Sequence, residues 1–139
     1  MTFIIGMFLS FVKPWHLTLY QDNEVIRLIG LVILLISLIL NILAYRMFKK
    51  HVTPHAPFST PIVLIQKGVF SLSRNPVYLA LALSQCGLGF VFDTVWLLLT
   101  ALILLISLQY LIVPDEEKIL ERRFKKSYEH YKKDTRRWL

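Results

Sequence analysis

VIRLIGLVILLISLILNILAY, residues 25–45, is the clearest candidate for a membrane-spanning helix in this chain. A helix of about 20 apolar residues matches the hydrocarbon thickness of a bilayer. Arg27 lies near one end of the stretch, where its long side chain can reach the headgroups. Tyr45 and Arg46 mark the other interface, where such side chains are common. The stretch therefore predicts a transmembrane helix.

A second apolar region, residues 77–113, is too long for one span and contains a break. Gly87 and Gly89 are followed by Asp93 and Thr94, either of which can cap a helix that begins near Val95. We expect two spans joined by a tight turn, at about residues 77–92 and 95–113. Pro114 and the acidic residues after it are expected to end the second span.

The first twenty residues are apolar up to Val12 and are then interrupted by Lys13 and Pro14. No basic segment or small-residue cleavage site is present, so a cleaved signal peptide is not expected. We expect a retained, kinked span at about residues 2–20, with Trp15 and Tyr20 near the outer interface. The predicted fold class is an all-α integral membrane protein with about four transmembrane helices in one domain, residues 1–139.

Composition agrees with a membrane protein. The chain has 139 residues, of which 55% are hydrophobic, and its mean hydropathy is +0.56. The formal net charge of +7 could suggest nucleic acid, but no recognition motif accompanies it, and anionic lipid headgroups are the favoured partner. Cys86 is the single cysteine, which excludes an internal disulfide and most sulfur-ligated metal sites.

The distribution of lysine and arginine predicts the orientation. These residues gather in residues 46–74 and in the tail, residues 114–139, whereas the turn of the hairpin carries only Asp93. By the positive-inside rule, the loop of residues 46–75 and the tail both face the cytoplasm. With four spans, the N-terminus is expected there too.

The cytoplasmic loop contains three prolines between His51 and Pro61, so it is predicted to be an ordered loop or a lid. His51 and His55 have a metal-like spacing, but Pro54 breaks the helix that would align them and no third ligand is near. No metal site is predicted. Gly68 is expected to permit a turn that leads the chain back to Arg74.

The opening of the hairpin reads Arg74-Asn75-Pro76-Val77-Tyr78. A guanidinium here can grip a carboxylate or phosphate, or it can simply anchor the chain to lipid phosphate. Pro76 suits the first turn of a helix, whose free N–H groups favour an anion, and Asn75 is a natural cap. Tyr78 faces about the same side as Arg74 and offers a hydroxyl.

The tail carries a stripe at three- and four-residue steps, formed by Glu117, Leu120, Phe124, Tyr128 and Tyr131. The stripe predicts an amphipathic interfacial helix. Glu116 and Glu117 can offset the helix macrodipole or bind a ligand, and both interpretations stay open. A basic cluster and an acidic pair on one side of the bilayer suit a zwitterionic, partly cationic small molecule.

These residues together resemble the isoprenylcysteine carboxyl methyltransferase family and the related phospholipid methyltransferases. The resemblance runs from about Thr53 to the C-terminus. It rests on the segments from Gly68 to Leu79, from Glu116 to Leu120, and on Phe124, Tyr128-Glu-His-Tyr131 and Arg137-Trp138.

The resemblance implies a multispan helical fold that binds S-adenosylmethionine at its cytoplasmic end and methylates a lipid-like or prenylated acceptor. It implies catalytic roles for Arg74, Asn75 and Tyr78. It implies cofactor contacts from Arg74, Asn75, Pro76, Tyr78, Glu116, Glu117, Tyr128 and Tyr131.

The chain also departs from that family. The prenylcysteine enzymes usually have histidine where this chain has Asn75, which can form hydrogen bonds but cannot titrate. A small residue, often glycine, commonly follows the tyrosine by two, and here it is Ala80. Gly87-Leu88-Gly89 weakly matches the glycine-x-glycine element of phospholipid methyltransferases, and it could equally serve hairpin packing. These departures weaken a prenylcysteine substrate and leave methyl transfer intact.

Two other functions are weighed. One is a membrane reductase of the sterol-reductase type, which would bind a nicotinamide cofactor in the same region. The other is a non-enzymatic membrane adaptor, whose basic tail only docks to lipid.

Overall fold

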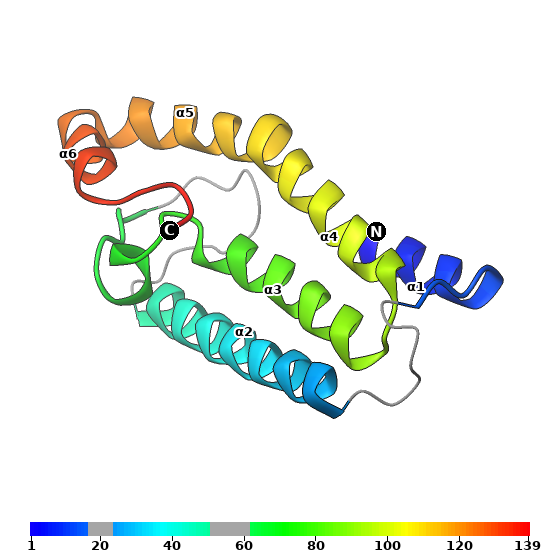
Figure 1. Cartoon of the computed structure of the whole chain (residues 1–139). Helices are drawn as coiled ribbons and strands as arrows, with labels where there is room; N and C mark the ends of the chain where they lie inside the picture. The colour runs from blue at the N-terminus through cyan, green and yellow to red at the C-terminus, as the bar shows by residue number, and fades with distance from the viewer. Residues whose placement is uncertain (17–23, 51–61) are drawn as a thin grey trace. The chain divides into compact units, whose positions relative to one another are not determined.

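The computed structural model describes residues 1–16, 24–50 and 62–139, and every regular element within them is helical (Figure 1). The elements are α1 (Thr2–Val12), α2 (Glu24–Lys50), η1 (Gly68–Ser71), α3 (Pro76–Val91), α4 (Val95–Ser107), η2 (Leu108–Ile112), α5 (Val113–Phe124) and α6 (Lys126–Asp134). The chain forms two compact units: unit 1 comprises Met1–Leu38 and Ala80–Ser107, and unit 2 comprises Ile39–Leu79 and Leu108–Leu139.

Among the described residues, two helices are long and apolar enough to cross a membrane: α2, and the continuous helix Val95–Phe124 that contains α4, η2 and α5. Only 17% and 22% of their most apolar windows are buried, which is unlike the core helix of a soluble protein. The apolar helices α1 and α3 are shorter. The all-helical prediction is confirmed, and the full set of four spans stays a prediction.

The first helix ends earlier than expected. α1 stops at Val12, and residues 13–16 are not helical. Lys13, with φ −141° and ψ 88°, leaves the helical conformation because the ring of Pro14 disfavours helical geometry in the residue before it. The rest of the predicted first span, including Tyr20, lies outside the described residues.

Unit 1 is held together by close helix packing with a few polar contacts. α1 lies beside α4, where the Ser10 and Thr94 hydroxyl oxygens are 2.7 Å apart (Figure 1). Gln85 of α3 is buried and donates to the Thr100 hydroxyl of α4 at 2.6 Å. The turn falls at residues 92–94 and α4 begins at Val95, as predicted.

The glycines of α3 serve packing in unit 1. A Cβ on Gly87 would lie 2.8 Å from Leu34 Cγ and 3.0 Å from the Gly30 carbonyl of α2. A Cβ on Gly89 would lie 2.8 Å from a methyl carbon of Leu98. These contacts explain the glycine-x-glycine element as close helix packing.

Unit 2 has its own apolar core, which fixes the segment before α3. Ala44 of α2 packs with Ile65, Val69 and Phe70, and the Phe48 and Phe70 rings meet edge to face with centroids 5.4 Å apart. The turn predicted at Gly68 is confirmed, because its φ of +65° is one that glycine adopts without strain. The chain is thereby directed toward Arg74.

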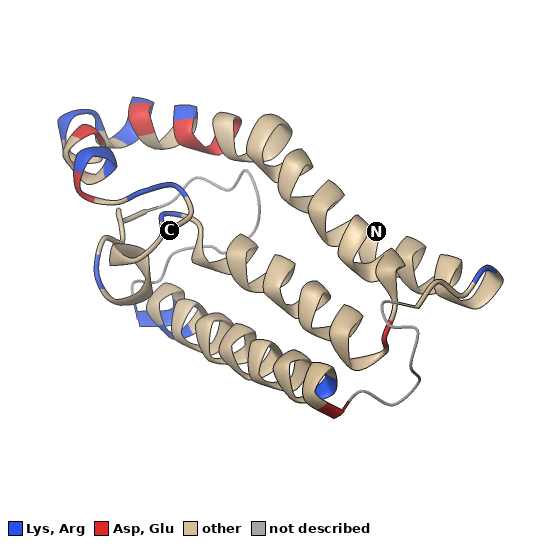
Figure 2. Cartoon of the chain, viewed as in Figure 1, with Lys and Arg blue, Asp and Glu red and all other residues tan. Residues whose placement is uncertain are grey.

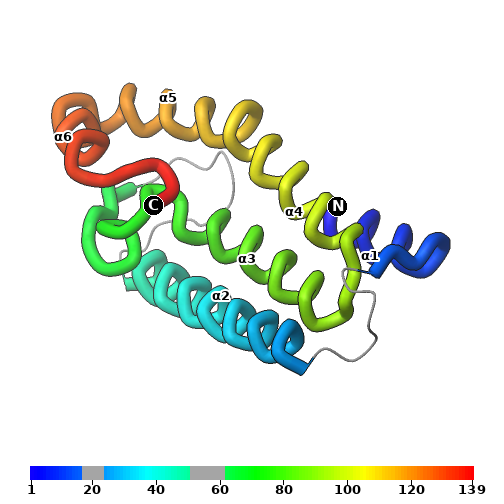
Figure 3. The backbone as a smooth tube through the Cα atoms, viewed as in Figure 1, coloured from blue at the N-terminus to red at the C-terminus, as the bar shows by residue number. Residues whose placement is uncertain are grey.

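The prediction that the second helix of the hairpin ends at Pro114 is wrong. The helix continues from α4 through the π-helical η2 into α5, which Figure 3 follows as one continuous coil. Pro114 occupies one of the first two positions of α5, where its missing N–H does little harm. The wider π turn directly before it accommodates the change in hydrogen bonding.

The prediction of a single helix in the tail is also wrong. Lys125, with φ 46° and ψ −121°, separates α5 from α6. The predicted stripe is therefore divided: Glu117, Leu120 and Phe124 lie on α5, and Tyr128 and Tyr131 lie on α6. Charged residues occur along both helices (Figure 2).

Candidate functional site

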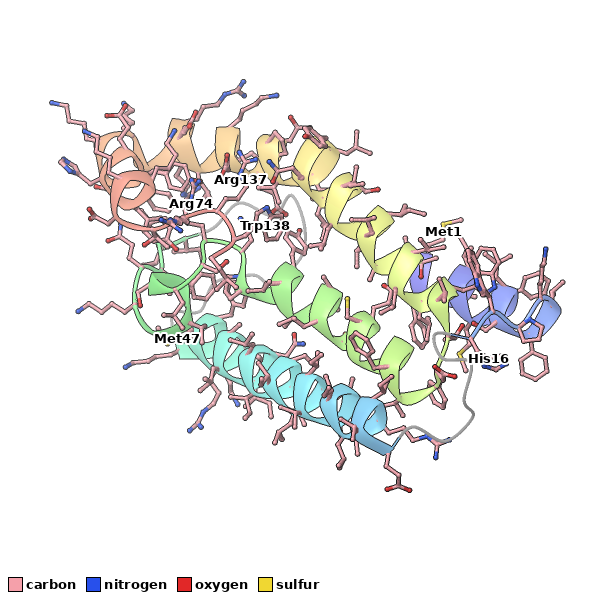
Figure 4. The ribbon with its side chains drawn as sticks, in the orientation of Figure 1. Met1, His16, Met47, Arg74, Arg137 and Trp138 are labelled. Atoms are coloured by element: carbon pink, nitrogen blue, oxygen red, sulfur yellow. The ribbon has the colours of Figure 1, made fainter. Side chains whose placement is uncertain are left out.

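A buried ion cluster forms in unit 2 around the Glu117 carboxylate. Arg74 Nη1 lies 3.0 Å from Glu117 Oε1, and Arg137 Nη2 lies 2.6 Å from Oε2. Arg137 Nε donates a further hydrogen bond to Oε1 at 3.2 Å, so its guanidinium binds both oxygens. The side chains of Arg74 and Glu117 are only 11% and 13% exposed, so solvent screens this cluster weakly. Figure 4 shows Arg74, Arg137 and Trp138 lying close together.

The electrostatic balance of this cluster favours an anion. Two guanidinium groups face one carboxylate, which leaves an excess of positive charge. Arg74 Nε is buried and donates no hydrogen bond within the described part of the chain. A buried donor without a partner is unfavourable, so an acceptor placed there would be bound strongly.

The residues before α3 are fixed by the C-terminal residues 136–138, which we call the C-terminal strap. The Arg136 carbonyl accepts from the Arg74 amide at 3.1 Å. The Arg137 carbonyl accepts from the Ser73 hydroxyl at 3.1 Å and from the Asn75 side-chain amide at 3.2 Å. Asn75 thus precedes α3 as predicted, and its side-chain amide donates to the strap.

Tyr78 and Glu116 form a second polar pair in unit 2. The Tyr78 hydroxyl donates to Glu116 Oε1 at 2.7 Å, which joins the first turn of α3 to α5. Pro76 is the first residue of α3, as the sequence predicts. The two adjacent glutamates therefore bind different partners: Glu116 a phenol, and Glu117 two arginines.

The two tyrosines of α6 pack over the segment before α3. The Tyr128 hydroxyl accepts from Arg74 Nη1 at 3.3 Å, and the Tyr131 hydroxyl donates to the Phe70 carbonyl at 2.5 Å. The pKa of Tyr128 is raised to about 12, chiefly by burial and then by the Glu117 charge, with Arg74 opposing the rise. Burial likewise raises the pKa of Tyr131. Both phenols are therefore neutral hydrogen-bonding groups near neutral pH.

The structure brings most of the predicted residues into two contact groups. Arg74, Asn75, Glu117 and Tyr128 are linked through the strap and the ion cluster, and Tyr78 contacts Glu116. In the described residues no group of three or more His, Cys, Asp and Glu side chains is placed to hold a metal, while His51 and His55 lie outside those residues.

Arg137 belongs to the ion cluster, but the sequence prediction omitted it from the site. It lies twenty positions beyond Glu117, in irregular chain after α6, so no helical spacing joins the two. Ser73 and Trp138 were omitted as well, and Trp138 Nε1 donates to Gln109 Oε1 at 2.7 Å. The Arg137-Trp138 pair belonged to the family resemblance, and that signal could have placed Arg137 in the site.

Comparison with known proteins gives one family. Residues 25–127, well over half of the chain, match the family model for phospholipid methyltransferases. The matched region contains Arg74, Glu116 and Glu117 and ends before Tyr128 and Arg137. A comparison with curated proteins gives no match.

Proposed function

Since the chain belongs to the phospholipid methyltransferase family, we propose that it is an integral-membrane enzyme that methylates a lipid-like acceptor at the cytoplasmic face, using S-adenosylmethionine. The observation that carries the proposal is the buried Arg74–Glu117–Arg137 cluster within a chain of that family. The acceptor class is an amphiphile, either a phospholipid or a prenylated molecule.

The chemistry of the cluster fits the amino-acid part of this cofactor. Its carboxylate suits the guanidinium of Arg74, whose buried Nε–H donates no hydrogen bond within the described residues. Its ammonium group suits Glu117 or Glu116, and its adenine and ribose suit aromatic faces and hydroxyls such as those of Tyr128. When bound, S-adenosylmethionine supplies an electrophilic methyl group.

The role of the protein in such a transfer is placement of the acceptor and exclusion of water. Methyl displacement requires an in-line approach, and the buried cluster provides fixed, poorly hydrated groups that can hold one reactant. A carboxylate or thiolate acceptor needs no general base, so Asn75, which cannot titrate, is compatible with catalysis. An amine acceptor would first have to lose a proton.

The acceptor is proposed to arrive from within the bilayer. The exposed side of α2 carries apolar residues along most of its length, such as Leu28, Leu35 and Ile42. An acceptor with an apolar tail would concentrate in lipid beside such helices and present its head group to the site.

Ligand-dependent stability of the detergent-purified protein tests the cofactor. A ligand that binds only the folded state raises the unfolding temperature, with about 2.7 kcal/mol of stabilisation at a hundred times its Kd. We expect S-adenosylhomocysteine, the demethylated form of the cofactor, to raise the unfolding temperature and NADPH to leave it unchanged. Stabilisation by NADPH alone would support the reductase, and stabilisation by neither would support the adaptor.

A further inference from the structure

The C-terminal strap presents to the site the same polar pattern as a zwitterionic amino acid. Its Arg136 and Arg137 carbonyl oxygens accept from the Arg74 amide, the Ser73 hydroxyl and the Asn75 amide. Its Arg137 guanidinium binds the Glu117 carboxylate. The strap thus places acceptor oxygens against the donors before α3, and the Arg137 guanidinium against the Glu117 carboxylate.

We propose that the strap is an autoinhibitory pseudo-ligand, which must leave Glu117 and the donors before α3 when a zwitterionic ligand binds. The proposal rests on the proposed function, because it takes the amino-acid part of the cofactor as the competing ligand. It concerns regulation of access to the site and adds no chemical step.

The Glu117 carboxylate is already bound by guanidinium groups, which supports direct competition between the strap and a ligand. Arg137 binds both carboxylate oxygens, and Arg74 binds one of them, in surroundings that leave 13% of the Glu117 side chain exposed. A ligand ammonium group therefore reaches this carboxylate only if a guanidinium withdraws. The Arg74 side chain is 11% exposed, whereas the Arg137 side chain is 27% exposed. Arg137 is thus the one that can withdraw more easily.

The attachment of the strap also suits release. Arg136 and Leu139 are exposed, and Arg137 and Trp138 are partly exposed. Its contacts to Ser73, Asn75, Glu117 and Gln109 are polar, and each can be exchanged for a contact with ligand or water. Segments with little apolar burial open locally at low free energy. The strap can therefore open while the core of unit 2 remains folded.

The affinity of S-adenosylhomocysteine for three forms of the full chain in detergent tests the proposal. If the strap is mostly closed, the apparent Kd of the wild type is raised by the inverse of the open fraction. Arg137→Gln removes the competing cation, so we expect it to bind the probe about threefold to tenfold more tightly. Arg136→Gln is the matched control, because its guanidinium is exposed, and it should bind as the wild type does.

A second probe separates competition from a general change in the site. Methylthioadenosine carries the adenosine part without the amino-acid part, so it makes no demand on Glu117 or on the donors before α3. We expect Arg137→Gln to leave its affinity unchanged. Weaker or unchanged binding of S-adenosylhomocysteine to Arg137→Gln, or equal tightening of both probes, would overturn the proposal.

Hydrogen exchange of the Arg74 amide tests the strap without any ligand. This amide donates to the Arg136 carbonyl, so its exchange reports opening of the strap. We expect about tenfold faster exchange in Arg137→Gln, as befits the loss of a charged hydrogen-bonded pair, and no change in Arg136→Gln. Equal exchange in all three forms would overturn the proposal. If exchange responds but no form binds S-adenosylhomocysteine, the cofactor assignment fails and the strap remains a closing element.

Discussion

Glu117 is the residue around which the candidate site is organised. Two guanidinium groups converge on its carboxylate, one from the segment before α3 and one from the C-terminal strap. The adjacent Glu116 binds only a phenol among the contacts described above. Neutralising the Glu117 charge would leave Arg74 as a buried cation with fewer acceptors, which is strongly unfavourable in poorly hydrated surroundings.

Glu117→Gln is expected to weaken binding of S-adenosylhomocysteine about tenfold to a hundredfold, because a charged hydrogen bond contributes roughly 1.5–3 kcal/mol. Isothermal titration in detergent measures this. Glu121→Gln is the control: it lies one turn further along α5, is exposed and pairs with Lys132. Equal losses in both variants, or unchanged affinity in Glu117→Gln, would return Glu117 to a purely structural role.

Residue-level prediction from the sequence succeeded where local rules apply. Pro76 begins α3 and Gly68 adopts a positive φ, because proline and glycine each restrict or permit particular backbone angles. Arg137 was not predicted, because it lies in irregular chain after α6 and only the tertiary fold brings it to Glu117. Spacing rules extend over one or two helical turns and do not reach across twenty residues.

At the scale of elements, two of the departures from prediction occur at the ends of α5. A periodic pattern of side chains predicts one helix from Glu117 to Tyr131, since periodicity does not detect a change of backbone angle at Lys125. The predicted helix end at Pro114 was wrong because the π-helical turn before it lets the helix continue past the proline.

Lys125→Gly is expected to stabilise the protein by about 1 kcal/mol. Positive φ with this ψ strains a residue that has a Cβ by about 1–3 kcal/mol, and the greater freedom of glycine in the unfolded chain removes part of the gain. Thermal unfolding in detergent measures the effect. Lys125→Ala removes the same charge but keeps the Cβ, so it should show no gain. Stabilisation by alanine as large as by glycine would contradict strain as the cause.

Gly87→Ala is expected to destabilise unit 1 by about 1–3 kcal/mol, since overpacking of a close helix contact forces neighbouring atoms apart. The new Cβ would lie 3.0 Å from the Gly30 carbonyl, which belongs to backbone and cannot turn aside. Ser84→Ala, on the same helix, is the control. A Gly87→Ala variant with the thermal stability of Ser84→Ala would show that the contact relaxes freely.

At the scale of the whole molecule, the apolar pattern predicted the helical class and a turn at about Asp93 and Thr94, which the structure has at residues 92–94. Length and composition place α2 and Val95–Phe124 among helices able to span, but α1 and α3 are short by that measure. The number of spans depends on the surrounding bilayer and on packing against it, which local sequence patterns do not fix.

The orientation prediction rests on the lysine and arginine bias of residues 46–74 and of the tail. Single cysteines introduced at Gln66 and Lys132, in a Cys86→Ser background, report the side of each segment. We expect an impermeant thiol reagent to label both only from the cytoplasmic side. Labelling of the two positions from opposite sides would divide the candidate site across the membrane and contradict a single cytoplasmic site.

The most direct measurement follows labelled methyl groups from S-adenosylmethionine into acceptors in the same detergent. Wild-type protein is compared with Glu117→Gln, and each long-chain amphiphile is paired with a short, water-soluble analogue of the same head group. We expect transfer to a lipid-like acceptor with a higher rate and a higher apparent affinity than to its short analogue, and a large loss of transfer in Glu117→Gln. Absence of transfer to any amphiphile, or transfer by Glu117→Gln at the wild-type rate, would contradict the proposed function.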